Sequence, residues 1–355
     1  MTFKFTSNRF VLLACLSFAF SMSTTIDAQG AQGFYVNDFK NIIGDIEKED
    51  QLLEFAQANN FNYLLLYNLY FIHNDLFDIT TGNTAMPLAN FIHKAKTIYG
   101  IKEVGAVGET FQSFIAIDAY NQLFINDPSF RFDVYHMEFE FWNEETVQDY
   151  YCTAYLQESG YNCNTLGAFD YYYKELQNIT ALAHATEVKV ESYIGFPSSD
   201  QSQKIGELVD RLLVHFYRQS DVYVNGNSIY NYHHYRLKDL SPTNGSLEIL
   251  PIFSARPLSM GPWLENNPIE QAYDTFMYGK RGYLEQNGSW KDHINIEGYQ
   301  WYRYTDLLEF AQGEANNNIV TVYPNPTQEM IHFEFTNPGN TKVSLTDVFG
   351  KINID

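Results

Sequence analysis

Three side chains in the segment 132–142 could take part in acid–base chemistry. The segment reads FDVYHMEFEFW and alternates polar and apolar residues, as a strand with one face against a hydrophobic layer does. Alternation places His136, Glu138 and Glu140 on one face, and Trp142 follows on the same side. Successive residues on one strand face lie about 6.5–7 Å apart at Cα. The two glutamates are therefore expected to be close neighbours.

Two carboxylates at this spacing can divide the work of an acid and a base. Like charges this close raise the pKa of one carboxyl, which makes a proton donor available near neutral pH. Cleavage of a glycosidic bond needs such an acid and a second carboxylate that stabilises positive charge at the sugar. The alternative is structural, because a glutamate-rich strand end can also bind water or pair with a lysine or arginine of a neighbouring strand.

The elements that position this segment read as alternating strands and helices. Apolar runs with strand character alternate with amphipathic helical patterns, such as 48–60 and 87–100. Eight strands, each followed by a helix, in about 250 residues are typical of a (β/α)8 TIM barrel, which we predict over residues 29–312. A doubly wound open sheet is the alternative, but no glycine-rich phosphate loop follows the first strand. The predicted strands span 33–39, 62–69, 101–109, 132–142, 188–196, 211–218, 247–253 and 294–302.

The connection after the fourth strand is expected to form part of the site. Active sites of such barrels lie at the C-terminal ends of the strands, and this connection, from 143 to about 169, is long and rich in tyrosine. Cys152 and Cys163 lie within it, with ten residues between them, and predict a disulfide in an exported chain. The alternatives are two unpaired thiols and a loop that covers the side of the barrel.

Other ionisable residues give weaker signals. Glu109 and Glu191, near strands three and five, could line the same end of the barrel or pair locally. The pair His233-His234 has no further ligands at a metal-binding spacing, and the sequence contains no HExxH or CxxC pattern. The sequence therefore predicts neither a metal nor a cofactor.

Composition and the first residues indicate an exported protein. Residues 1–28 read as a secretory signal peptide, in which Lys4 and Arg9 precede an apolar stretch too short for the ~20 residues that span a bilayer. No later stretch predicts a transmembrane segment. The formal net charge of −21 repels phosphate backbones and anionic lipid, which argues against nucleic-acid and membrane-surface partners. An apolar content of 45% is enough for a large core.

The last residues change character after an Asn-rich linker at 313–321. The segment 322–355 begins with VYPNP and continues with the alternating strand IHFEF and the strand-turn VSLTDVFGK. These pieces resemble the C-terminal sorting domain of the type IX secretion system of Bacteroidetes, without its final strands and basic tail. The resemblance implies a truncated, sandwich-like all-β segment. It also implies the type IX secretion machinery as a partner and a secreted or outer-surface location.

The fourth strand resembles that of the family-18 glycoside hydrolases, the chitinase and endo-N-acetylglucosaminidase group. That family is a (β/α)8 barrel whose fourth strand ends in DxxDxDxE. Asp133 and Glu140 match the first and last positions, whereas His136 and Glu138 stand at the two middle ones. The resemblance implies that Glu140 is the proton donor and that Glu138 orients the acetamido group of the substrate.

Later strands supply further parts of this resemblance. Tyr217 matches the tyrosine of a Tyr-Asp pair that ends the family's sixth strand, with Arg218 in place of the aspartate. In the eighth strand, YQWY offers Trp301 as the floor of the sugar site. The predicted catalytic residues are Glu140, Glu138 and Tyr217, and the predicted substrate-binding residues are Trp301, Trp142, His136 and Glu109.

A second resemblance overlaps the first. WNEE at 142–145 is similar to the Trp-Asn-Glu that ends strand four in clan-A retaining glycosidases, which would make Glu144 the acid/base. The nucleophile of that clan ends strand seven, where this chain has Ser254 and Ala255. The expected function is hydrolysis of N-acetylglucosamine-containing glycans by substrate-assisted retention. The alternative is a catalytically inactive barrel that binds glycan at the cell surface.

Overall fold

The computed structural model describes most of the predicted barrel and four short strands near the C-terminus. The signal peptide predicted at 1–28, Arg218 and the His233-His234 pair lie outside the described residues. Side chains are described up to residue 310. The described segments are 30–217, 236–240, 247–279 and 282–316, followed by the strands at 321–322, 333–334, 344–347 and 350–353.

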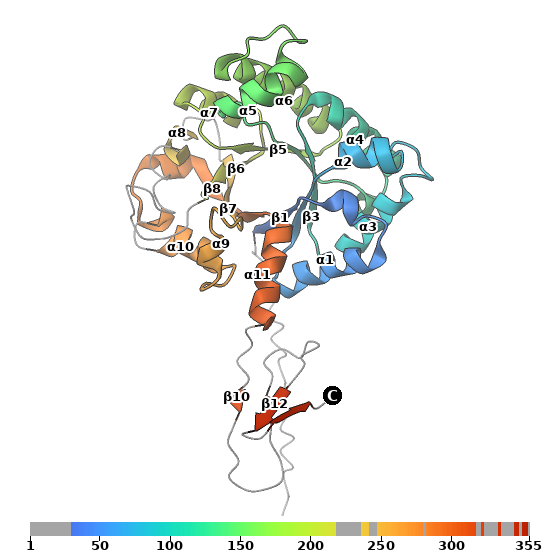
Figure 1. The fold of residues 1–355 in the computed structure, drawn as a ribbon. Coiled ribbons are helices and arrows are strands. Elements are labelled where there is room, and N and C mark those ends of the chain that lie inside the picture. Colours follow the sequence, from blue (N-terminus) through green and yellow to red (C-terminus); the bar gives the residue numbers. More distant parts are fainter. Residues whose placement is uncertain are drawn as a thin grey trace, which may run out of the picture.

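Parallel strands close into a barrel, which confirms the predicted (β/α)8 fold (Figure 1). The strand order is β6-β5-β4-β3-β2-β1-β9-β7, and pairing of β6 with β7 closes the ring. The predicted eighth strand is divided in two. Its first part, β8 (Ile294–Ile296), pairs with the start of β7, and its second part, β9 (Gly298–Tyr302), pairs with β1 and with the end of β7. The other strands are β1 (Ala31–Val36), β2 (Tyr63–Leu66), β3 (Glu103–Gly108), β4 (Val134–Met137), β5 (Lys189–Ile194), β6 (Arg211–His215) and β7 (Leu247–Ser254).

Helices surround the barrel, and several begin at capping side chains (Figure 1). The side chains of Asp45 and Asn164 accept backbone N–H groups at the starts of α1 and α6, and Ser198 and Gln201 form a capping box on α7. The helices are α1 (Ile46–Ala58), α2 (Leu69–Phe71), α3 (Met86–Thr97), α4 (Phe111–Leu123), α5 (Glu144–Thr146), α6 (Thr165–His184), α7 (Ser199–Gly206), α8 (Lys238–Leu240), α9 (Gly261–Leu264), α10 (Gln271–Tyr278) and α11 (Tyr304–Asn316). Shorter 3-10 turns are η1 (Phe39–Asn41), η3 (Pro128–Phe130), η6 (Tyr283–Glu285) and η7 (Ser289–His293), and π-helical turns are η2 (Ile72–Leu76) and η4 (Val147–Leu156).

The core has two layers, because each strand buries both of its faces. A large outer layer fills the space between strands and helices, and a smaller inner cluster fills the barrel. The alternation predicted for β4 is confirmed, since its apolar set lies in the outer layer. That set consists of Tyr135, Met137, Phe139 and Phe141.

Beyond the barrel, the C-terminal segment contains two antiparallel strand pairs. One joins β10 (Thr321–Val322) to β11 (Phe333–Glu334), and the other joins β12 (Ser344–Asp347) to β13 (Gly350–Asn353). The helix α11 ends at Asn316, inside the segment expected to be linker. The assignment of 322–355 as a sorting segment stays a prediction. Among the residues that the structure describes, no helix has the length and apolar character needed to cross a membrane.

Candidate active site at the C-terminal end of the barrel

The strand β4 directs the candidate acid–base residues to the C-terminal end of the barrel, which we call the mouth. Regular pairing continues past Met137, because the backbone N–H of Glu138 donates to the carbonyl of Gly108 on β3 (3.0 Å). Phe139 then packs in the outer layer. Glu138 and Glu140 consequently leave the strand on the inner side, as the alternation predicts.

Glu138 is a partly accessible side chain with a buried carboxyl oxygen. Its Oε2 atom has no hydrogen-bond partner among the described residues. Burial raises the pKa of Glu138 to about 8, and the negative charge of Glu140 adds to the increase. The carboxyl therefore carries a proton at neutral pH. The sequence led us to expect repulsion between the two glutamates as the cause of a raised pKa. For Glu138 this repulsion is the smaller cause, and burial is the larger one.

Four tyrosines that belong to the inner cluster or pack against it lie within electrostatic reach of this carboxyl. They are Tyr35 on β1, Tyr193 on β5, Tyr217 two residues after β6 and Tyr302 on β9. Burial raises the pKa of each, and the negative charge of Glu138 contributes in every case. Tyr217 hydrogen-bonds to Tyr193 and stacks on Tyr302, with ring centroids 6.2 Å apart. The mouth is therefore lined by neutral hydroxyl groups that can bind a polar, uncharged ligand.

Glu140 is half-buried, like Glu138, and is held by the loop that follows it. Its backbone N–H donates to the hydroxyl of Tyr151 (3.0 Å), and its Oε2 accepts from the side-chain amide of Asn143 (3.2 Å). The side chain of Asn143 also accepts the N–H of Thr146 at the start of α5. Glu140 is thus fixed through the helix cap, and it stands in the position that the sequence resemblance gives to a proton donor.

Trp142 forms part of the wall of the mouth. Its ring meets Tyr193 edge to face at 5.4 Å and packs against both the inner cluster and the outer layer. A Cβ atom at Gly195 would come within 2.5 Å of the indole. A glycine is therefore needed beside Trp142, and the aromatic wall depends on the end of β5.

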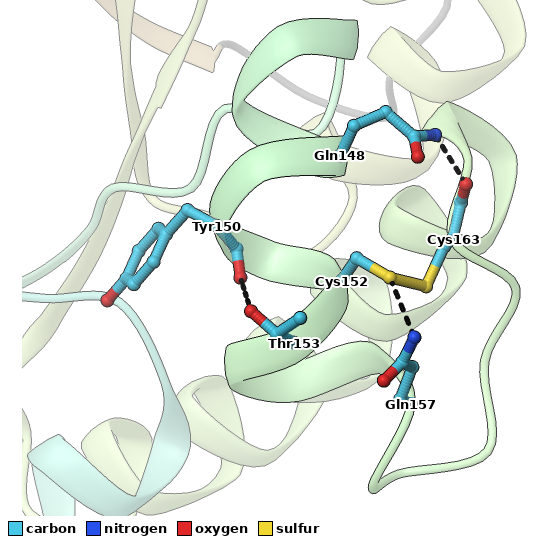
Figure 2. Close-up of a disulfide and its surroundings, with 6 residues drawn as sticks. All are labelled: Gln148, Tyr150, Cys152, Thr153, Gln157 and Cys163. Carbon is cyan, nitrogen blue, oxygen red and sulfur yellow. Dashed lines mark hydrogen bonds between the residues drawn. A yellow bond between two sulfur atoms is a disulfide. The ribbon is translucent and has the colours of Figure 1, made fainter.

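The predicted disulfide between Cys152 and Cys163 is confirmed, with an S–S distance of 2.01 Å. It joins η4 to the segment before α6, and the Gln148 amide adds a hydrogen bond to the carbonyl of Cys163 (2.6 Å) (Figure 2). Tyr150 projects from the opposite side of η4 (Figure 2). The bridge closes a short loop and so limits the conformations of the connection after β4.

Glu109 anchors this connection to the end of β3. Its Oε2 atom accepts from the hydroxyls of Tyr150 (3.0 Å) and Tyr155 (2.6 Å), both on η4. Of the two interpretations of Glu109, local pairing describes these contacts. Its predicted contact with substrate has no support in this arrangement, because the carboxylate is engaged by the loop.

The predicted role of Trp301 is wrong. Trp301 is 0% exposed and lies in the outer layer, where its ring is 5.4 Å from that of Phe253. It faces the helices, so it cannot lie beneath a sugar in the mouth. The next residue, Tyr302, faces inward and takes part in the aromatic lining. The resemblance therefore identified the right strand but the wrong face.

His136 also differs from its predicted role in substrate binding. The side chain is 0% exposed, and both of its ring nitrogens are engaged, Nδ1 with Glu191 (2.7 Å) and Nε2 with Tyr35 (3.0 Å). It lies below the mouth, inside the barrel. Glu191 is likewise 0% exposed and pairs with Arg211 on β6, which confirms the alternative of local pairing for this residue.

Two further candidates do not strengthen the site. Glu144 is exposed and begins α5, and the buried Ser254 ends β7 where a clan-A nucleophile would stand. No group of three or more metal-binding side chains is found in the part of the chain that the structure describes. The chemistry of the mouth must therefore be argued from Glu138, Glu140 and the tyrosines.

Comparison with known proteins adds little beyond the fold. No family model matches the chain, and no curated protein matches it. The structure is similar to a chitinase from Chromobacterium violaceum ATCC 12472, with 12% identity, coverage of 64% of this chain and 68% of that one, and a TM-score of 0.33. A GH18 chitinase from Pseudoalteromonas aurantia has 12% identity, coverage of 81% and 99%, and a TM-score of 0.39. The YdjI aldolase from Escherichia coli K12 has 12% identity, coverage of 82% and 81%, and the same TM-score of 0.39. These proteins differ in their chemistry, so none of them assigns a function to this chain.

Proposed function

We propose that the mouth of this barrel hydrolyses glycosidic bonds in N-acetylglucosamine-containing glycans, with Glu140 as the proton donor. The observation that carries the proposal is the neighbouring pair Glu138 and Glu140, of which Glu138 retains a proton at neutral pH among neutral tyrosines. A site that holds a carboxylic acid beside a second carboxyl supplies what glycosidic cleavage requires.

The proposed reaction proceeds by retention with help from the substrate. The pair starts the reaction with one proton, which passes from Glu138 to Glu140 when the substrate binds. The acetamido oxygen then attacks the anomeric carbon while the bond to the leaving oxygen breaks, and that oxygen takes the proton from Glu140. The Glu138 carboxylate that results accepts the acetamido N–H, and the Tyr217 hydroxyl donates to the acetamido oxygen. Water then opens the cyclic intermediate and returns a proton to Glu140.

A second candidate function is glycan binding without catalysis. The observation that favours it is His136, which stands where the resembled family has an aspartate and whose two nitrogens are already engaged inside the barrel. A glutamate in place of aspartate at position 138 also moves a carboxyl by about one C–C bond. Errors of ~1 Å in a reacting group can reduce a rate about 100-fold.

Hydrolysis of a 4-methylumbelliferyl chitobioside by the full chain tests the proposal. We expect release of the fluorophore, a loss of 100-fold or more in Glu140→Gln from removal of the acid, and no loss in the exposed control Glu145→Gln. Equal turnover in Glu140→Gln and wild type would contradict the assignment of the acid. Absence of turnover together with affinity for chitin oligosaccharides in all three proteins would support the binding function instead.

We also propose that the protein is exported and reaches the outer surface through type IX secretion. The signal-peptide pattern at 1–28, the resemblance of 322–355 to a sorting domain and the disulfide of the barrel support this proposal. Cell fractionation of the native host, with and without residues 322–355, is the test. Retention of the shortened chain in the periplasm would support a sorting role, and equal export of both chains would contradict it.

A further inference from the structure

Glu140 lies past the end of β4, where its backbone is no longer bonded to the sheet. Two residues earlier, the N–H of Glu138 still donates to the carbonyl of Gly108 on β3 (3.0 Å). The N–H of Glu140 donates instead to the side-chain hydroxyl of Tyr151 on η4 (3.0 Å). A tyrosine of the connection after β4 thus takes the place that a neighbouring strand has for Glu138.

Two other contacts of Glu140 come from the residues directly after it. Its carbonyl accepts the N–H of Asn143 (3.0 Å), and its Oε2 accepts from the side-chain amide of the same residue (3.2 Å). The bond to Tyr151 differs because it joins residues 11 positions apart. It therefore connects the backbone of Glu140, from which the carboxyl extends, to the far part of the connection.

Tyr151 contacts this segment with its ring as well as with its hydroxyl. The side chain is buried, and its ring lies flat on that of Phe139, with centroids 3.8 Å and planes 12° apart. Phe139 is itself buried in the outer layer, so the stack joins Tyr151 to the core. One side chain therefore holds two successive residues, Phe139 through its ring and Glu140 through its oxygen.

The turn η4, which carries Tyr151, is anchored on two sides. Cys152, the next residue, is joined by the disulfide to Cys163 in the segment before α6 (Figure 2). Two neighbouring tyrosines of η4 donate to the Oε2 atom of Glu109 at the end of β3 (3.0 and 2.6 Å). A cross-link directly beside Tyr151 restricts the positions that its hydroxyl can take.

We propose that Tyr151 is a positioning residue for Glu140, and that the disulfide between Cys152 and Cys163 acts on Glu140 through it. The disulfide fixes η4, η4 places the hydroxyl of Tyr151, and this hydroxyl fixes the backbone that carries the carboxyl of Glu140. A chain without the bridge holds Glu140 less firmly. The use of Glu140 as an acid rests on the function proposed above, whereas the fixing of its backbone does not.

Amide hydrogen exchange tests the proposal without any turnover. In protein isotopically labelled at its glutamate nitrogens, one NMR spectrum reports the amides of both Glu138 and Glu140. Tyr151→Phe removes the hydroxyl and retains the ring on Phe139. We expect exchange at Glu140 to accelerate about 10-fold or more, because its N–H loses its acceptor, and exchange at Glu138, which is bonded to β3, to stay unchanged. Unchanged exchange at Glu140, or equal acceleration at both amides, would overturn the positioning role.

The matched control is Tyr150→Phe, which removes the neighbouring hydroxyl of η4, bonded to Glu109. It should leave exchange at Glu140 unchanged, and an acceleration equal to that in Tyr151→Phe would overturn the assignment to Tyr151.

Replacement of both Cys152 and Cys163 by serine tests the role of the bridge. Exchange at Glu140 should accelerate about 10-fold or more, with no further acceleration when the replacement is added to Tyr151→Phe, because the bond that the bridge supports is then already absent. Additive effects would overturn the link between the bridge and Glu140. Reduction of the folded wild type by dithiothreitol, which opens the bridge to two thiols while the reagent is oxidised to its own disulfide, gives the same comparison without a substitution.

Kinetics separate this proposal from the proposed function. If the chitobioside is hydrolysed, Tyr151→Phe should lower kcat about 10-fold and leave KM unchanged, because the acid is displaced while the groups that bind the sugar remain. A raised KM with unchanged kcat would contradict an effect through the acid. If no protein hydrolyses the substrate, the glycosidase proposal fails, while exchange at Glu140 still supports or overturns the role of Tyr151.

Discussion

Glu138→Gln should change how the stability of the protein depends on pH. Burial raises the pKa of Glu138 from 4.5 to about 8. Between these values the folded protein holds a proton that the unfolded chain has lost, so the free energy of unfolding decreases as pH rises through this window. Each unit of pH corresponds to about 1.4 kcal/mol. The contribution is complete below pH 4.5 and is lost by the time the pH passes about 8.

Glutamine has a similar shape and no charge, so the variant lacks this dependence. From pH 5 to pH 8 the unfolding free energy of Glu138→Gln should therefore increase relative to that of wild type by about 3–4 kcal/mol. This is an upper value, because part of the Glu138 side chain is accessible to solvent. Urea unfolding at both pH values measures this change in relative stability, and Glu54→Gln, at an exposed position on α1, is the control. The same difference at pH 5 and pH 8 would refute the reasoning, since it would mean that the folded protein does not hold Glu138 in its neutral form.

Three further changes test other parts of the structure. Arg211→Met leaves Glu191 buried without its cation and should lower the unfolding free energy, measured by chemical denaturation, by about 3–5 kcal/mol. Adding Glu191→Gln to Arg211→Met should restore part of this unfolding free energy. A double variant as unstable as Arg211→Met would contradict the assignment of the pair. Replacement of both Cys152 and Cys163 by serine should cost about 3 kcal/mol through the loop that the bridge closes, and limited proteolysis should then cut between 143 and 169 faster than in wild type. Gly195→Ala forces the Trp142 indole to move and should weaken binding of chitin oligosaccharides in calorimetry, whereas Gly82→Ala, which meets open space, should not.

The sequence was sufficient to predict β4 because its alternation is strong. Every second residue from Tyr135 to Phe141 is large and apolar, and the residues between them are His136, Glu138 and Glu140. A period of two with such contrast leaves one orientation that buries the apolar set beneath the helices. The disulfide could be predicted in a comparable way, because two cysteines follow the predicted signal peptide and both lie in one connection.

The eighth strand lacks that contrast, and the prediction there was wrong. In YQWY both faces carry an aromatic residue, with Tyr299 and Trp301 on one side and Gln300 and Tyr302 on the other. Polarity therefore does not determine which side faces the barrel. The break between β8 and β9 does, because Gly298 follows it with φ = 142° and the register of the strand against β7 changes there by one residue. A shift of one residue exchanges the two faces, so Tyr302 rather than Trp301 reaches the mouth.

Interior charges could not be assigned from the sequence either, because each depends on partners far along the chain. An imidazole at position 136 needs an acceptor for Nδ1, and Glu191 supplies it from the next strand. Glu191 in turn needs a cation, which is Arg211 on the strand after that. These three residues therefore form one unit, in which a change at any position leaves a buried charge or donor without its partner. An aspartate at position 136 would place a second carboxylate against Glu191, so this barrel interior does not suit one. The interior of this chain is thus adapted to a histidine at position 136.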